Sequence, residues 1–223
     1  MLVLGIDTCG PSGTIALARL DGDALGFRGQ TEIPGKTYSA QLVPAIRELL
    51  AGNEAAIAEI ETIVVTNGPG SFTGIRIGLS TAKGLAEPAS IPIVAVSRLA
   101  VLAHTAKTQA AALDASRGEF YFGDYSGPDS EESLLTRESF VECAAVLGGQ
   151  VAVCESAILG LAPAATCVAP PTAADALYFS LPRLRARAFD DPLLLDGNYI
   201  RRSDAEIFSK PGLRSNPKPA PRS

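Results

Sequence analysis

The sequence predicts a mixed α/β protein made of two lobes. Hydrophobic residues make up 47% of the 223-residue chain, which is enough apolar material for two cores. Strand patterns and helix patterns alternate along the chain, and their order occurs twice, the second time in a shortened form. We therefore expect a first lobe at residues 1–97 and a second lobe at residues 98–208, followed by a tail at residues 209–223.

The first copy begins with three hairpin-linked strands before any helix. Apolar runs separated by glycine-containing turns predict these strands, and apolar residues at helical spacing predict the first helix. The predicted elements are strands at 2–7, 14–20 and 24–33, a helix at 39–50, a strand at 62–66, a helix at 73–86 and a strand at 91–96. This βββαβαβ order is that of a ribonuclease-H-like lobe.

The second copy repeats this order with shorter elements. The predicted elements are a helix at 97–107, strands at 109–115, 119–126 and 134–140, a helix at 141–147, strands at 151–154 and 166–168, and a helix at 172–188. A βββαβα repeat with a shortened second lobe indicates the actin-like (ASKHA, ribonuclease-H-like) fold. In the actin, Hsp70 and sugar-kinase superfamily, ATP lies between the two copies.

A glycine-rich turn joins the strand at 62–66 to the helix at 73–86. Gly68, Pro69 and Gly70 end the strand, because proline removes a donor and glycine permits a sharp turn. Either Ser71 or Thr73 can accept a hydrogen bond from the free N–H groups of the next helix. The turn therefore predicts a well-defined helix start.

The helix after this turn carries a stripe of small residues. The members recur at every fourth position, so no side chain on this flank is larger than a methyl group. They are Gly74, Gly78, Ala82 and Ala86. Three interpretations stay open: a close contact with another helix, tight packing on the chain's own sheet, and a phosphate site at the helix N-terminus. The spacing disfavours phosphate, because Ile75 and Arg76 stand where a P-loop has Lys and Ser or Thr.

Two acidic turns are the candidates for nucleotide binding. Asp7 and Thr8 end the first strand, where an actin-like ATPase places the acid that meets metal and phosphate. Asp114 begins the matching turn of the second copy, which has one glycine and a bulky Arg117. An Asp at the end of a strand is more often a turn former. A complete ATP clamp is therefore missing, and we expect no cofactor.

The composition disfavours metal and acyl-transfer chemistry. His104 is the only histidine and lies on an apolar helix, so we expect it to be structural. The four cysteines have no C-x-x-C spacing, which argues against a zinc or iron site. We expect them to be free, although pairing of Cys154 with Cys167 stays open. We therefore predict no catalytic residue and no metal.

Charge and hydropathy predict a cytoplasmic protein without membrane contact. The apolar runs are shorter than the roughly 18 residues of a membrane span, and the start lacks the features of a signal peptide. The formal charge is −5, and the tail contributes four basic residues without an acidic one, so the rest of the chain is near −9. An acidic body repels nucleic acid. The proline-rich tail at 209–223 has too little apolar content to fold and is predicted to be disordered.

Four segments together resemble the TsaB family, also called YeaZ. They are Gly5 to Thr8, the Gly-Pro-Gly-Ser-Phe-Thr-Gly motif from Gly68 through Phe72 to Arg76, the turn Leu113 to Glu119 with Arg117 and Gly118, and Tyr199 to Arg202. The second segment is the most specific of them. The resemblance covers residues 1–208.

The resemblance implies a non-catalytic subunit in bacterial tRNA modification. In that pathway TsaC makes threonylcarbamoyl-adenylate, TsaD transfers the threonylcarbamoyl group to the adenosine beside the anticodon, and TsaE is an accessory ATPase. TsaB binds TsaD and enables it. The resemblance thus implies a heterodimer with TsaD, with tRNA met only through the complex. A contact with TsaE and a homodimer of the chain alone stay open.

The family's interface is a bundle of the two first-lobe helices, which match residues 39–50 and 73–86 here. The interface residues that the resemblance implies are Leu42, Ile46, Leu49, Gly74, Ile75, Gly78, Leu79, Ala82 and Ala86. We therefore expect Gly78→Leu or Ala82→Leu to leave the chain folded and to prevent pairing with TsaD.

The chain departs from the family pattern at two places. Tyr38 stands where many members have histidine, and Glu155 and Ser156 replace glycines after a second-lobe strand. Both changes argue against bound nucleotide. An ATP-dependent phosphotransferase or ATPase acting in the interlobe cleft remains the alternative, and a peptidase would have to depend on Ser71 or His104.

Overall fold

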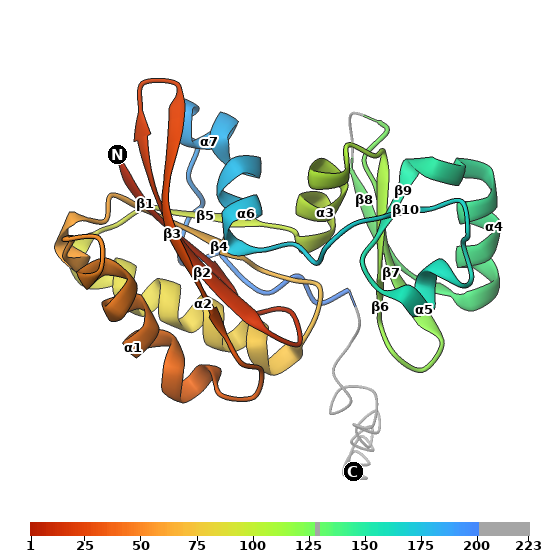
Figure 1. The fold of residues 1–223 in the computed structure, drawn as a ribbon, viewed down its shortest axis with the longest axis horizontal. Helices are drawn as coiled ribbons and strands as arrows, with labels where there is room; N and C mark the ends of the chain where they lie inside the picture. Colours follow the sequence, from red (N-terminus) through yellow and green to blue (C-terminus); the bar gives the residue numbers. More distant parts are fainter. Residues whose placement is uncertain (128–129, 201–223) are drawn as a thin grey trace, which may run out of the picture.

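The computed structural model describes residues 1–127 and 130–200. Two five-stranded sheets form two lobes that lie side by side (Figure 1). The first sheet contains, in spatial order, β3 (Ala24–Ile33), β2 (Gly13–Asp21), β1 (Leu2–Asp7), β4 (Thr62–Thr66) and β5 (Ile93–Val96). The second contains β10 (Thr166–Cys167), β9 (Val151–Val153), β6 (Ala110–Asp114), β7 (Glu119–Asp124) and β8 (Glu131–Thr136).

Both sheets have the same topology. Strands β1, β2 and β3 pair antiparallel, and β4 and β5 extend the sheet in parallel from β1. In the second lobe β6, β7 and β8 pair antiparallel, and β9 and β10 extend the sheet in parallel from β6. Parallel neighbours need helical crossovers, which the intervening helices supply. The predicted two-lobed ribonuclease-H-like fold is confirmed.

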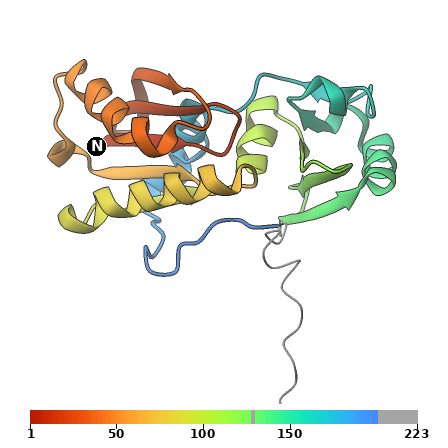
Figure 2. The same ribbon diagram turned by 90° about the horizontal axis from the view of Figure 1, so that it is seen from below.

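Helices cover both faces of the first sheet and separate it from the second (Figures 1 and 2). One face of the first sheet is covered by α1 (Tyr38–Ala51) and α2 (Phe72–Ala86), and its other face by α6 (Ala173–Phe179) and α7 (Leu181–Ala186). Helix α3 (Arg98–Ala106) lies between the sheets, and α4 (Arg137–Leu147) and α5 (Ser156–Leu159) cover the outer face of the second sheet. Short 3-10 turns lie at Ile57–Glu59, Glu87–Ala89 and Gly148–Gln150. Every helix in the described part of the chain is too short or too polar to cross a bilayer.

The alternation of side chains along β1 divides the core of the first lobe. Leu4 and Ile6 are fully buried beneath α1 and α2. Val3 points to the opposite face, where it packs with α6. Gly5 lies on that face too, and a Cβ added there would lie 2.9 Å from the carbonyl oxygen of Ala173. A small residue in the central strand therefore lets α6 pack closely on the sheet.

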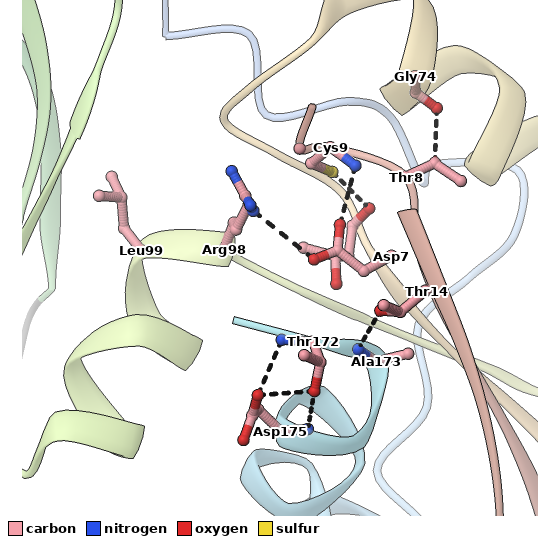
Figure 3. A network of polar contacts seen from close by, with 12 residues as sticks. Asp7, Thr8, Cys9, Thr14, Gly74, Arg98, Leu99, Thr172, Ala173 and Asp175 are labelled. Carbon is pink, nitrogen blue, oxygen red and sulfur yellow. Dashed lines mark hydrogen bonds and ion pairs between the residues drawn. The ribbon is translucent and has the colours of Figure 1, made fainter. Parts of the chain in front are cut away.

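The lobes are divided differently from the predicted ranges 1–97 and 98–208. The strands of the two sheets do separate at Ser97, but α6 and α7 return to the first sheet. There the Ala173 N–H donates to Thr14 Oγ1 at 2.7 Å, and Thr172 caps α6 together with Asp175 (Figure 3). The back of the first sheet would otherwise expose Val3 and its neighbours, which explains the return. Residues 201–208 and the tail 209–223 lie outside the described residues.

Two predicted boundaries are wrong. The strand predicted at 134–140 ends at Thr136, whose side chain accepts a hydrogen bond from the Ser139 N–H at 3.3 Å and caps α4. Phe140 is then a buried helical residue. The helix predicted at 172–188 is two helices, broken at Ser180 before Pro182. Local capping and proline geometry determined both boundaries.

Candidate functional site

The glycine turn packs against the end of β1. The Ser71 N–H donates to the carbonyl oxygen of Cys9 at 2.8 Å, and the Ser71 hydroxyl accepts from the Gly74 N–H at 3.2 Å. Gly70 has φ +153°, and a Cβ there would lie 2.3 Å from the Cys9 carbonyl oxygen. Gly68 has φ +113° and, like Pro69, is buried. The motif therefore fits α2 onto the first strand.

The small-residue stripe of α2 receives Thr8. The Thr8 hydroxyl donates to the carbonyl oxygen of Gly74 at 2.7 Å (Figure 3). A Cβ added at Gly74 would lie 1.9 Å from the Thr8 carbonyl oxygen, and one added at Gly78 would lie 2.3 Å from Thr8 Oγ1. Ala82 is fully buried on the same flank. Of the three interpretations of the stripe, tight packing on the chain's own sheet is the one that the structure supports.

The expected interface residues are therefore not open to a partner, which corrects the sequence prediction. All nine are buried in the first lobe: Leu42, Ile46, Leu49, Gly74, Ile75, Gly78, Leu79, Ala82 and Ala86. The apolar residues among them belong to a single core cluster with β1, β2 and β4. A periodic apolar face identifies the buried side of a helix, but it does not distinguish burial on a sheet from burial in a partner.

The opposite sides of α1 and α2 face solvent. We call seven of their exposed residues the docking face: Val43, Pro44 and Arg47 of α1, with Thr73, Arg76, Ser80 and Gly84 of α2. Both helices lie along the same flank of the first lobe (Figure 1). Val43 is 43% exposed, and a Cβ added at Gly84 would meet no atom within 4 Å. On α2 this surface is also poor in large side chains.

A buried ion pair joins the end of β1 to the start of α3. Arg98 Nε lies 3.6 Å from Asp7 Oδ2, and the two side chains are only 7% and 4% exposed (Figure 3). The other carboxylate oxygen, Asp7 Oδ1, accepts from the Cys9 N–H at 2.8 Å. Burial alone would lower the pKa of the Arg98 guanidinium, but the Asp7 carboxylate raises that pKa above its ordinary value. Both oxygens of Asp7 therefore have partners within the chain.

The sequence analysis did not identify Arg98 as a site residue, although its isolated charge in an apolar segment indicates one. It is the only charged residue between Ile91 and Ala103. A lone charge in an apolar strand–helix junction requires a buried counter-ion. Ser97 caps α3, and the Arg98 N–H donates to the Gly68 carbonyl oxygen at 2.6 Å. The junction thus connects α3 to the glycine turn.

A cleft of about 420 Å³ lies between the lobes. Its lining includes Cys9, Gly10, Pro11, Gly35, Lys36, Tyr38, Gly70, Ser71 and Arg98 from the first half of the chain, and Leu113, Asp114, Ala115, Ser116, Tyr121 and Glu155 from the second. The Tyr38 hydroxyl donates to the carbonyl oxygen of Gly10 at 2.9 Å. Burial raises the pKa of the Glu155 carboxyl, and the nearby Arg98 opposes this shift. The cleft is therefore lined with groups of both signs.

The second-lobe turn is a local structure at the edge of this cleft. Asp114 Oδ1 accepts from the Ser116 N–H at 2.8 Å, the turn-forming role that the sequence left open for such residues. Arg117 is exposed, and Gly118 has φ +77° between it and Glu119. In residues 1–127 and 130–200, no group of three His, Cys, Asp or Glu side chains is placed to hold a metal ion.

The cysteines of the described residues are free. Cys167 pairs in register with Val153, so the two side chains point to the same face of the sheet. Cys154 follows Val153 and points to the opposite face, which separates it from Cys167. The pairing that the sequence left open is therefore not formed. His104 is exposed, and its ring and the Phe179 ring form a T-shaped pair with ring centroids 5.4 Å apart.

Alkaline pH is expected to destabilise the fold through Cys9. Burial, followed by the Asp7 charge, raises the pKa of this thiol well above its ordinary value of 9.0. In the unfolded chain the thiol ionises near that value, so unfolding releases a proton and stability falls as pH rises above it. One proton corresponds to about 1.4 kcal/mol per pH unit. Urea titrations of the chain and of Cys9→Ser between pH 8 and 11 test this, with a shallower decline expected for the variant; equal declines would contradict it.

A family model and individual relatives place the chain among known proteins. The family model described as "TsaD: tRNA N6-adenosine threonylcarbamoyltransferase" matches residues 31–181. The TsaB protein of Bacillus subtilis is 39% identical over 129 residues, which cover 56% of this chain and 55% of that protein. The TsaB protein of Haemophilus influenzae is 35% identical over 109 residues, which cover 44% and 46%. The chain spans about half the length of the curated relatives it matches.

Solved structures support the fold. YeaZ from Pseudomonas aeruginosa aligns with a TM-score of 0.68 at 22% identity, covering 88% of this chain and all of that one. A protein described as similar to peptidase YEAZ, also from P. aeruginosa, aligns with a TM-score of 0.71 at 23% identity, covering 90% and 99%. The chain therefore belongs to the TsaD family, and the relatives that it resembles in sequence are TsaB proteins.

Proposed function

We propose that the chain acts in tRNA threonylcarbamoyladenosine biosynthesis as a non-catalytic subunit that binds TsaD. The process is the one named in its curated relatives. Recognition of tRNA is then left to the complex, in the cytoplasm. The observation that carries the proposal is the ion pair of Asp7 with Arg98. Asp7 stands where an actin-like ATPase has the acid that meets metal and phosphate, and here its carboxylate is already paired with a guanidinium.

The docking face is the surface that we assign to TsaD. Its exposed residues on α2 are mostly small, so a partner helix can approach the α2 backbone at Ser80 and Gly84. Val43 and Pro44 supply neighbouring apolar area on α1. This replaces the buried stripe of the sequence prediction with the outward side of the same two helices. The same surface would serve a homodimer when TsaD is absent.

Gly84→Leu is expected to leave the fold intact and to weaken TsaD binding at least tenfold. The Cβ at position 84 meets open space in the free chain, and leucine is a better helix former than glycine, so stability should not fall. A leucine would hold a docked helix away from the α2 backbone, and tenfold corresponds to about 1.4 kcal/mol. Calorimetric titration with TsaD of the same organism measures the effect.

The matched control is Ala157→Leu, which enlarges a small exposed residue of α5 in the second lobe. It should bind TsaD as the unmodified chain does. Melting temperatures of both variants check folding. Unchanged affinity for Gly84→Leu would contradict the assignment of the docking face, and absence of any complex with the unmodified chain would contradict the proposed function.

Titration with Mg-ATP addresses the alternative of a phosphotransferase or ATPase. Asp7 is neutralised by Arg98, and its Oδ1 is bonded to the Cys9 N–H, so we expect no saturable heat at micromolar nucleotide. Phosphate release should likewise stay at the background rate. Micromolar binding together with turnover by the chain alone would instead support the enzyme.

A further inference from the structure

Three side chains form a stack at the N-terminal end of α2. The guanidinium carbon of Arg76 lies 4.0 Å from the centre of the Phe72 ring, one helical turn earlier. The Phe72 ring in turn contacts Tyr199, with ring centroids 4.9 Å apart and planes inclined by 45°. We call Arg76, Phe72 and Tyr199 the aromatic stack. It places one charged group of the docking face on a rigid base.

The stack is held by hydrogen bonds from both lobes. The Asn198 N–H, next to Tyr199, donates to the Asn67 carbonyl oxygen at 2.7 Å, at the start of the glycine turn. The Asn198 side-chain amide donates to Glu132 of β8. The Tyr125 hydroxyl donates to the other oxygen of Glu132 at 2.6 Å. Tyr199 is therefore fixed against the first lobe by a segment that is bonded to the second.

Arg76 has no acidic partner of its own in the described part of the chain. Its side chain is exposed and lies over the Phe72 ring. Its outward neighbours on α2, Thr73 and Ser80, carry no charge. A guanidinium that rests on an aromatic ring has lost part of its rotamer freedom before binding, which lowers the entropic cost of pairing.

We propose that Arg76, oriented by the aromatic stack, is an anchor of the docking face that pairs with a carboxylate side chain of the protein partner. A planar guanidinium fits a carboxylate through two parallel hydrogen bonds. Phosphate has the same fit, but a nucleic-acid backbone requires several cations in a row, and the chain outside the tail carries a charge near −9. This inference rests on the proposed pairing with TsaD.

Calorimetric titrations of full-length variants against TsaD test the anchor. We expect Arg76→Gln to weaken binding about 30-fold, as for an interface hot spot. Arg76→Lys keeps the charge but lacks the planar fork, so most of this loss should remain. Tyr199→Leu keeps Arg76 and removes part of its base, so a loss of about three- to tenfold is expected. Arg137→Gln, at an exposed position of α4, should bind unchanged.

The outcomes separate this inference from the proposed function. If the unmodified chain binds TsaD and Arg76→Gln binds equally well, the anchor is wrong and the docking proposal stands. If Arg76→Lys binds TsaD with full affinity, the proposed pair of parallel hydrogen bonds to a carboxylate is wrong. If Arg76→Gln weakens binding of tRNA to the complex but not the affinity for TsaD, the partner is a phosphate and the inference is overturned. A chain that never binds TsaD overturns both.

Discussion

Gly74→Ala is expected to lower the free energy of unfolding by about 3 kcal/mol or more, a cost at the upper end for an added methyl group in a packed core. The new Cβ would lie 1.9 Å from the carbonyl oxygen of Thr8. Backbone atoms cannot swing aside, so α2 would have to move away from β1. That movement would also break the 2.7 Å hydrogen bond from Thr8 Oγ1 to the Gly74 carbonyl oxygen. Urea denaturation followed by circular dichroism measures the loss.

Gly84→Ala is the matched control on the same helix. Its Cβ meets no atom within 4 Å, so the substitution should stabilise the chain by about 0.5–1 kcal/mol through helix propensity. Opposite signs at positions 74 and 84 would establish that the stripe serves packing on β1. Similar effects at both positions would contradict the close approach of Thr8 to α2.

Arg98→Met is expected to cost about 3–5 kcal/mol, because it leaves the Asp7 carboxylate buried without its counter-ion. Methionine retains much of the side-chain volume, so the loss would report the charge rather than a cavity. The folded-state pKa of Arg98 lies above its ordinary value, so its contribution is complete below that value and is lost only at higher pH. The cost should therefore be the same at pH 6 and pH 8.

A double variant distinguishes the charge from other effects of the substitution. Asp7→Asn combined with Arg98→Met removes both charges and keeps an oxygen that can accept from the Cys9 N–H. It should recover more than half of the stability lost in Arg98→Met, since replacing both ions of a buried pair is often nearly neutral. A loss below about 1 kcal/mol for Arg98→Met would mean that water reaches the pair. A double variant as unstable as the single one would mean that packing, not charge, dominates.

The structure also changes how the proposed interface should be tested. Gly78→Leu was expected to leave the chain folded, but its Cβ alone would lie 2.3 Å from Thr8 Oγ1. Loss of TsaD pairing in that variant would report a damaged first lobe. Gly84 faces outward on the same helix and avoids this ambiguity. The buried and the exposed glycines of α2 therefore test different properties.

The sequence by itself determined the strands of both sheets and the order of the main elements. Periodicity, turn residues and the doubled βββαβα pattern gave the two sheets, and the motif from Gly68 to Arg76 gave a strand–turn–helix junction. These features depend on residues close to each other in the chain, so local patterns specify them. The same holds for the turn at Asp114, whose carboxylate bonds the N–H two residues later.

Only the tertiary structure decided which partner each surface meets. The small-residue stripe has the same periodicity whether it faces a sheet or a subunit, and Thr8, which fills it, is 66 residues away from Gly74 in sequence. The pairing of Arg98 with Asp7, the return of α6 to the first sheet and the stacking of Tyr199 on Phe72 likewise join distant segments. Such contacts follow from how the elements pack in three dimensions, which no local pattern of residues specifies.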